Sequence, residues 1–257
     1  MAQPLQKATQ STSPRPPKKS RPDWMEPALT AVVFGLFVLY SLWETLFHNN
    51  GVYGNYVSPF FSPQVGKWFG FKRFNAIPVV WVPFLFRATC YYYRKEYNRG
   101  WFWHPRSCAT NEVVGRKYTG ESRFPFSGTN LHRYFWYLAV IVLVFLWKDT
   151  VQAFFFSRGF QVHLGSVLML INAIFLTLYT FSCHAFRHLV GGGKDCYSCA
   201  FGPNAGKPTT SYSLWIRVSR WNQRHGSWAW LSLFSVLAVD LYIRLLIVGV
   251  IHDVRFF

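Results

Sequence analysis

The strongest apolar stretch of the chain is VLMLINAIFLTLYTF, residues 167–181, which lies inside a longer apolar run over residues 165–184. It contains no charged side chain. An α-helix needs about 20 mainly apolar residues to cross the hydrocarbon core of a bilayer. The stretch therefore predicts a membrane-spanning helix, and the rest of the sequence can be searched for helices of the same kind.

Four further stretches have a comparable character. The complete set of predicted spans covers residues 27–47, 77–93, 134–156, 165–184 and 227–251. The second is the weakest, because it is short and contains Pro78, Pro83 and Arg87. Proline is tolerated in a spanning helix where neighbouring groups satisfy the freed carbonyls. We therefore expect an all-α integral membrane bundle of five transmembrane helices.

The basic residues alternate between the two predicted sides of the membrane. The N-terminal tail and segments 94–133 and 187–224 together carry 19 Lys and Arg, whereas the alternate segments carry five. The positive-inside rule then predicts a cytoplasmic N-terminus. The net charge of +17 is thereby explained by topology and lipid contact, and we do not expect a nucleic-acid partner.

The composition divides the chain into two parts. Residues 1–24 are rich in Pro, Ser, Gln and Lys and predict a disordered cytoplasmic tail without a cleaved signal peptide. Residues 25–257 form the predicted membrane domain, with a cytoplasmic His/Cys loop over residues 182–224. Five cysteines, three of them close together, argue against a secreted disulfide framework.

A cluster of potential metal ligands follows the strongest span. His184 and His188 are four residues apart and share a helix face, and a glycine-rich turn leads to Cys196 and Cys199. Two imidazoles and two thiolates suit Zn²⁺ or a two-iron cluster with mixed ligation. Cys183 is a substitute ligand. Helix-end histidines beside free thiols are the alternative without a metal.

The histidines also allow a haem interpretation. They fall into two layers at opposite ends of the predicted spans, which would suit axial ligands of two b-type haems stacked in a bundle. The cytoplasmic layer contains His104, His132, His184, His188 and His225, and the outer layer contains His48, His163 and His252.

Ionisable residues inside the spans form a third group. Charges are costly in hydrocarbon and should face protein or water. Arg87, with Tyr91 one turn later, could supply hydrogen bonds to a quinone headgroup. Asp240 and Arg244 are four residues apart and can pair, either as a structural ion pair or as a second polar site for quinone or protons. The others are Glu44, Lys148 and Asp149.

Several of these segments resemble one family. The sequences FLFRATCYYYRK at 84–95, SCHAFRHLVGGG at 182–193, DLYIR at 240–244 and DVRFF at 253–257 resemble the membrane-anchor subunit of an actinobacterial-type succinate dehydrogenase, a haem-poor class of complex II with five helices. The resemblance extends from about residue 27 to residue 257.

The resemblance implies a function and partners. We expect a multi-pass protein of the bacterial inner (cell) membrane, docked to an iron–sulfur subunit and a flavoprotein subunit, in contact with lipid, and reducing a quinone. A higher oligomer of the whole complex is compatible with this. Succinate oxidation is not expected from this chain alone. Candidate quinone-pocket or docking residues are Arg87, Tyr91, Trp215 and Arg217.

The resemblance also implies a Rieske-like [2Fe-2S] cluster, carried over onto His184, His188, Cys196 and Cys199. A two-haem anchor would leave the two cysteines without a role, which favours the cluster. The alternatives that remain are a dihaem b-type anchor of the same complex and a zinc-stapled structural membrane protein or transporter.

Overall fold

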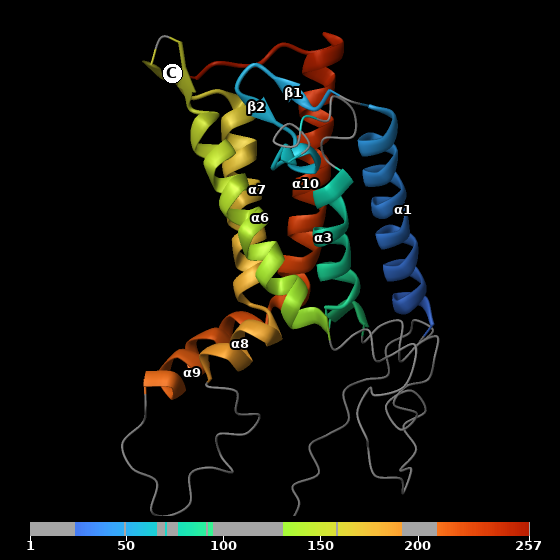
Figure 1. Ribbon diagram of the computed structural model, residues 1–257, viewed down its shortest axis with the longest axis vertical. Helices are drawn as coiled ribbons and strands as arrows, with labels where there is room; N and C mark the ends of the chain where they lie inside the picture. The colour runs from blue at the N-terminus through green and yellow to red at the C-terminus, as the bar shows by residue number, and fades with distance from the viewer. Residues whose placement is uncertain are drawn as a thin grey trace, which may run out of the picture.

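The computed structural model describes residues 24–48, 50–65, 70, 77–90, 92–94, 131–157, 159–191 and 210–256. The predicted disordered tail lies outside these ranges except for Trp24. Five helices run side by side as a bundle (Figure 1). They are α1 (Met25–Phe47), α3 (Ile77–Ala88), α6 (His132–Gln152), α7 (Leu164–Phe181) and α10 (His225–Val248).

Four of the five bundle helices are long and apolar enough to cross a membrane, namely α1, α6, α7 and α10. Each agrees with a predicted span to within four residues at either end. The remaining predicted span, residues 77–93, corresponds to α3, which has only 12 residues and contains Pro83. At about 1.5 Å per residue, α3 is too short to cross a hydrocarbon core of about 30 Å by itself. The expectation of five full spans is therefore not confirmed.

The long helices carry apolar side chains outward and polar side chains inward. On α1, Leu36 and Leu39 are exposed whereas Ser41 and Glu44 are buried. On α10, Leu241 is exposed and the neighbouring Asp240 is completely buried. The other long helices also carry exposed apolar side chains and buried polar ones, the reverse of the arrangement in a water-soluble protein. This reversal is expected where lipid replaces water as the solvent, because polar groups must then find partners inside the protein.

Two short helices extend from one end of the bundle at an angle to it, α8 (His184–Val190) and α9 (Thr210–Asn222) (Figure 1). Helices α1, α6 and α10 begin at this α8–α9 end, and α3 and α7 end there. The connections that the charge pattern predicts to be cytoplasmic therefore all start or finish at the same end.

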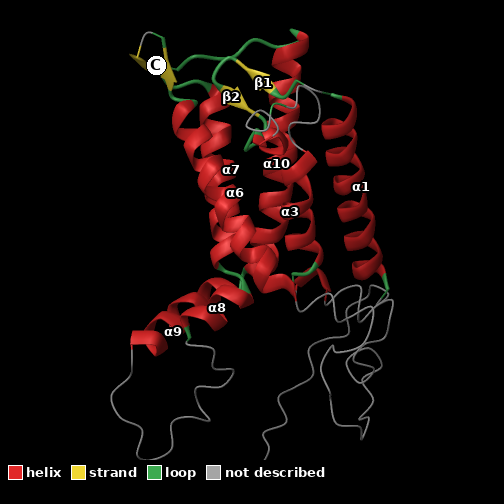
Figure 2. Cartoon of the chain, in the orientation of Figure 1, coloured by secondary structure: helices red, strands yellow, loops and turns green. Residues whose placement is uncertain are grey.

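The opposite end, called here the hairpin end, carries short strands (Figure 2). Strands β1 (Val52–Tyr53) and β2 (Tyr56–Val57) form one antiparallel hairpin, and β3 (Phe155–Phe156) and β4 (Gly159–Phe160) form another. A 3-10 turn, η1 (Pro59–Phe61), follows β2. The C-terminal segment lies against the start of α7 through Leu164 N–H to the Val254 carbonyl, 2.9 Å, and Phe256 N–H to the Val162 carbonyl, 2.8 Å.

Candidate functional site

Two cysteines and two histidines meet at the α8–α9 end, where Cys90, Cys183 and His225 are buried and His132 is half-buried. Cys90 follows α3, His132 begins α6, Cys183 separates α7 from α8, and His225 begins α10. The Nε2 atom of His225 lies 3.1 Å from the Cys90 sulfur, and the Nε2 atom of His132 lies 2.9 Å from the Cys183 sulfur. We call these residues the Cys/His group.

Both imidazole rings are held in place from their other side. The Nδ1 atom of His132 is 2.9 Å from the Thr89 hydroxyl, and the Nδ1 atom of His225 is 2.8 Å from the Ser182 hydroxyl. Each ring also stacks on an aromatic neighbour with 4.9 Å between centroids. Partners of this kind fix ring orientation and tautomer in metal sites, and here they direct both Nε2 atoms toward sulfur.

The two thiols lie out of contact with water. Cys90 is 0% exposed and Cys183 is 1% exposed, and this burial raises the pKa of both thiols. Without a metal they remain protonated, whereas a bound metal displaces the proton and takes the thiolate. Within the described ranges, no three His, Cys, Asp or Glu side chains converge closely enough to enclose a single metal ion. The group thus consists of two Cys–His pairs.

The ligands predicted from the H-x3-H and C-x2-C motif lie elsewhere. His184 and His188 are on α8, and their Nδ1 atoms lie against the guanidinium groups of Arg187 and Arg133 respectively. His184 is exposed. Cys196 and Cys199 are outside the described residues, so that ligand set remains a prediction. Of the residues predicted as ligands of a metal ion or [2Fe-2S] cluster, only the substitute Cys183 belongs to the Cys/His group.

Arg87 is buried beside this group, with 2% of its surface exposed. Its guanidinium donates to the Ala229 carbonyl at 3.0 Å and to the Ser232 hydroxyl at 3.0 Å. It also lies 4.6 Å from the centre of the Tyr179 ring. The expectation that Arg87 faces protein is confirmed, but its donors are directed at α10. Tyr91, its predicted companion, is outside the described residues.

A cavity of about 670 Å³ opens next to the Cys/His group. Its size is within the range of about 300–1,000 Å³ that small-molecule sites occupy. Arg87, Trp215 and Arg217 do not line it, and Trp215 instead lies 5.4 Å below the Arg187 guanidinium. The lining residues are Cys90, Tyr92, Cys183, His184, Arg187, Asn222, Gln223, His225, Gly226, Ser227 and Trp230.

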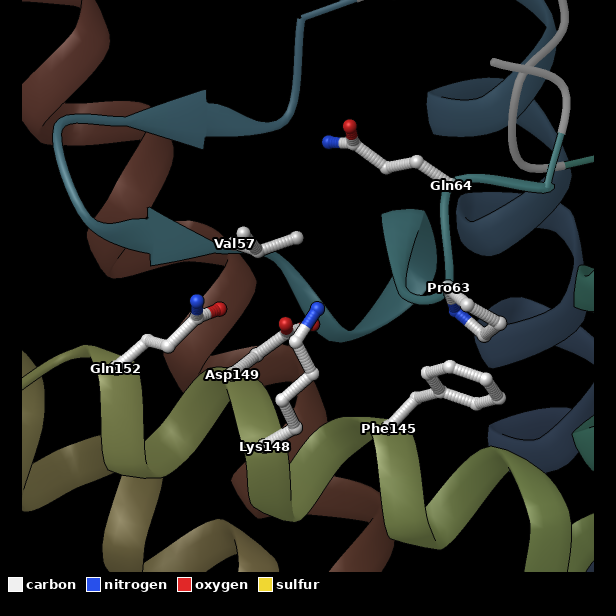
Figure 3. A pocket seen from close by; sticks show the side chains of 7 residues that line it. All are labelled: Val57, Pro63, Gln64, Phe145, Lys148, Asp149 and Gln152. Carbon is white, nitrogen blue, oxygen red and sulfur yellow. The ribbon is translucent and has the colours of Figure 1, made fainter. Parts of the chain in front are cut away.

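A second, smaller cavity lies at the hairpin end, between α6 and the segment that runs from β2 past η1 to Gln64 (Figure 3). Lys148, Asp149 and Gln152 line it from α6, and Gln64 lines it from the segment after η1. Its volume of about 230 Å³ is below the usual range for a small-molecule site. The Asp149 carboxylate accepts a hydrogen bond of 2.5 Å from Ser62, which gives it a structural role.

Asp240 and Arg244 lie in the second half of α10, whereas His225 of the Cys/His group begins this helix. The Arg244 Nε atom is 3.0 Å from Asp240, which confirms the predicted pairing. Arg244 also forms an ion pair with Glu44 of α1. The pair lines neither of the two cavities.

The architecture and this interior define an integral membrane protein with several spans. The family model described as actinobacterial succinate dehydrogenase subunit SdhC matches residues 25–249, and the chain belongs to this family. It is therefore a subunit of a succinate dehydrogenase complex and works together with the other subunits of that enzyme.

A solved structure gives the same relationship. The chain is similar to one in the structure entitled "Mycobacterium smegmatis Sdh1 complex in the apo form", with 35% sequence identity and a TM-score of 0.74. The similarity covers 97% of this chain and 100% of that chain. No curated protein matches the sequence.

The sequence contains a signal for the Cys/His group that the motif alone does not reveal. Spacing within one segment predicts Cys183 only as a substitute ligand and makes no prediction for Cys90, and it predicts His132 and His225 only as haem ligands. All four sit at the same end of four different predicted spans. Residues at corresponding ends of bundle helices can meet even when they are more than 100 positions apart.

Proposed function

We propose that this chain carries electrons from a docked iron–sulfur subunit to a membrane quinone, with a Rieske-like [2Fe-2S] cluster as the carrier. The α8–α9 end faces the cytoplasm and the partner subunits. The excess of Lys and Arg in the connections at this end supports that orientation, since basic segments are retained on the cytoplasmic side.

The Cys/His group is the donor set that best fits such a cluster. Two thiols and two imidazoles are the ligand types of a Rieske centre, in which histidines replace two cysteines on one iron. The observation that carries the proposal is the pairing of each buried thiol with an imidazole that a hydroxyl already orients. When bound, the cluster would supply a one-electron carrier whose potential the histidines raise.

The dihaem alternative has less support from the described histidines. In the outer layer, both ring nitrogens of His163 are occupied, Nδ1 by Asp253 and Nε2 by Gln161. The side chains of His48 and His252 are exposed. The inner His132 and His225 direct Nε2 toward sulfur. An axial haem ligand needs a free ring nitrogen aimed at the iron, so these arrangements favour the cluster.

In this proposal the quinone occupies the cavity of about 670 Å³, because both cysteines and His225 line this space. Trp230 and Tyr92 provide an aromatic wall, fixed by a hydrogen bond of 2.9 Å from the Trp230 indole to the Tyr92 hydroxyl. A flat ring can stack on such a wall. An electron carrier in direct contact with the cavity would keep the transfer distance short.

The ligand assignment can be tested by electron paramagnetic resonance of the purified, reduced complex. The variants Cys90→Ser and Cys183→Ser should lose the mixed-ligand signal and the share of acid-labile sulfide that this cluster contributes to the complex. The matched variants Cys196→Ser and Cys199→Ser should retain both. All four changes replace sulfur by oxygen, so they differ only in position.

The opposite pattern would transfer the cluster to the H-x3-H and C-x2-C motif. Strong b-haem absorption after reduction, with wild-type spectra in all four variants, would favour the dihaem anchor. Zinc bound to this subunit, with no iron or sulfide beyond that of the iron–sulfur subunit, would favour the zinc-stapled protein.

A further inference from the structure

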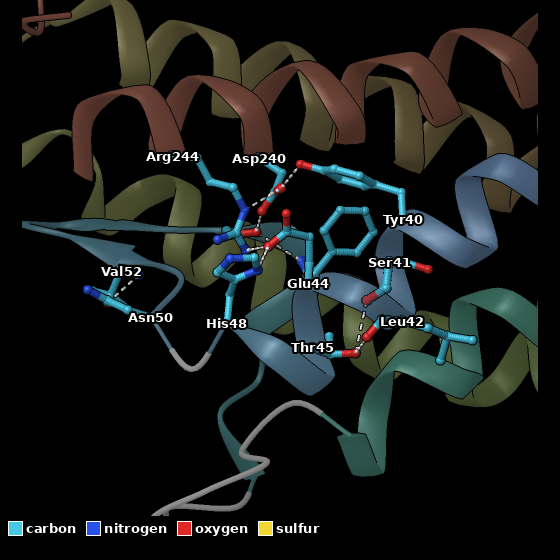
Figure 4. A network of polar contacts seen from close by, with 12 residues as sticks. Tyr40, Ser41, Leu42, Glu44, Thr45, His48, Asn50, Val52, Asp240 and Arg244 are labelled. Carbon is cyan, nitrogen blue, oxygen red and sulfur yellow. Dashed lines mark hydrogen bonds and ion pairs between the residues drawn. The ribbon is translucent and has the colours of Figure 1, made fainter. Parts of the chain in front are cut away.

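A network of charged groups is enclosed in the bundle near the hairpin end (Figure 4). Helix α1 contributes Tyr40 and Glu44, His48 directly follows α1, and α10 contributes Asp240 and Arg244. Asp240 is completely buried and Glu44 is 5% exposed. Neither carboxyl group has direct access to bulk water, so the network has to balance its own charge.

Asp240 is surrounded by hydrogen-bond donors. One carboxylate oxygen accepts from the Tyr40 hydroxyl at 2.6 Å and from Arg244 Nε at 3.0 Å. The other accepts from the Ser58 hydroxyl, which reaches it from the segment before η1. Three donors satisfy the ionised form of a carboxyl group and leave no acceptor for a proton of its own. Asp240 is therefore the anion that the single guanidinium neutralises.

Glu44 then lacks a full positive charge of its own. It shares the Arg244 guanidinium with Asp240, and its remaining partner is the His48 ring, with 3.1 Å between Glu44 Oε2 and His48 Nδ1. In the described part of the chain, the charged and titratable groups facing Glu44 are thus Arg244 and Asp240 from α10 and His48 directly after α1, with Tyr40 bound to Asp240. These groups balance when the Glu44–His48 pair holds one proton, either as a carboxylic acid or as an imidazolium.

The two members of this pair differ sharply in their contact with solvent. The side chain of Glu44 is 6% exposed, whereas that of His48 is 48% exposed at the end of the helix. Histidine accepts and releases protons near neutral pH, and its two nitrogens can act in turn. When Nε2 takes a proton from water, Nδ1 can pass its own proton to Glu44, and the reverse sequence returns it.

We propose that the Glu44–His48 pair is a proton-binding site that exchanges with the aqueous phase at the hairpin end, with His48 as the only relay needed. The site does not depend on the electron carrier proposed above, since it lies at the other end of the bundle. It gives the interior one titratable position whose occupancy follows the pH on the side opposite to α8 and α9.

The site can be tested by infrared difference spectroscopy of the purified complex during a pH titration. The wild-type protein should show a carboxyl titration that is absent from Glu44→Gln, which keeps the shape of the side chain but cannot ionise. The control Asp149→Asn removes a different carboxyl of the hairpin end and should leave that titration in place. Identical titrations in the wild-type protein and Glu44→Gln would overturn the proposal.

A second measurement does not depend on a change inside the network. His48 is half exposed, so His48→Ala should preserve the fold. After transfer to D₂O, exchange at Glu44 should become slower by about 100-fold, the lower end of what a positioned acid–base group contributes. Unchanged exchange would show that protons reach Glu44 without His48 and would refute the relay.

Discussion

At the scale of single residues, Arg87 shows how a cation can be retained inside the bundle. No carboxylate of the described residues forms an ion pair with it. Its charge is instead met by a carbonyl, a hydroxyl and the face of the Tyr179 ring. Hydrogen bonds from a charged donor are among the stronger ones, and a desolvated cation on an aromatic ring adds to them. Arg87 thereby joins α3 to α10 close to the Cys/His group.

The change Arg87→Ala should destabilise the anchor. It removes the charged donor of the Ser232 hydroxyl and one of the three side-chain donors of the Ala229 carbonyl. It also opens a cavity, and each effect is unfavourable in a buried place. We expect a loss of about 3 kcal/mol, measured by thermal unfolding of the complex. Lys148→Ala, an exposed cation on α6, serves as the control. Equal effects of the two changes would mean that the contacts of Arg87 contribute little.

The sequence allowed the burial of Arg87 to be predicted but not its partners. A charge in an apolar stretch must face protein or water, and that argument needs only the residues nearby. Ala229 and Ser232 are more than 140 positions away, and one of the two acceptors is a backbone carbonyl. No local pattern identifies such an acceptor, so only the packing of α3 on α10 could reveal it.

At the scale of secondary structure, the first turn of α10 determines the shape of the larger cavity. Gly226 directly follows His225, and a Cβ atom at this position would lie 2.6 Å from the Tyr92 ring. Real Cβ atoms do not approach other atoms so closely. The glycine is therefore needed for the contact between α10 and the segment after α3, and that contact forms one wall of the cavity.

The change Gly226→Ala should push the Tyr92 ring into the cavity and weaken quinone binding. We expect KM for quinone to rise by about tenfold, which corresponds to about 1.4 kcal/mol, with the paramagnetic signal retained. Gly35→Ala is a matched control, because nothing lies within 4 Å of a Cβ atom at Gly35. An unchanged KM in Gly226→Ala would exclude this cavity as the quinone site.

At the scale of the whole molecule, one carboxylate joins several segments of the hairpin end. Asp253 of the C-terminal segment accepts from the hydroxyls of Tyr56 and Tyr242 and lies 3.1 Å from His163 Nδ1. It also accepts from the Gly165 N–H group at 3.2 Å. Three parts of the chain thus converge on Asp253, and the contacts hold the β1–β2 hairpin, α7 and α10 together.

The contacts of Asp253 should make the stability of the protein decline at alkaline pH. Burial, reinforced by the hydrogen bond to Asp253, raises the pKa of the Tyr56 hydroxyl. An unfolded tyrosine loses its proton near pH 10. Above about pH 10 the unfolded state therefore loses protons first, and the free energy of unfolding falls as the pH rises.

Thermal unfolding between about pH 8 and pH 11 measures this decline. Tyr56→Phe should lower the unfolding temperature at pH 8, because Asp253 loses a donor, and should make the alkaline decline shallower. Tyr53→Phe changes a partly exposed ring of the same hairpin and should preserve the wild-type slope. If Tyr56→Phe also preserves that slope, another group causes the alkaline decline.

By itself, the sequence determined that this is a helical membrane protein with basic connections on one side, because hydrophobicity, helix length and charge distribution act locally along the chain. It also allowed the Asp240–Arg244 pair to be predicted from spacing on one helix. The tertiary structure decided that α3 is short and which residues meet. Cys90, His132, Cys183 and His225 come from four helix ends, and Glu44 reaches Arg244 from a different helix. Such contacts depend on how helices pack, which no periodicity within one segment encodes.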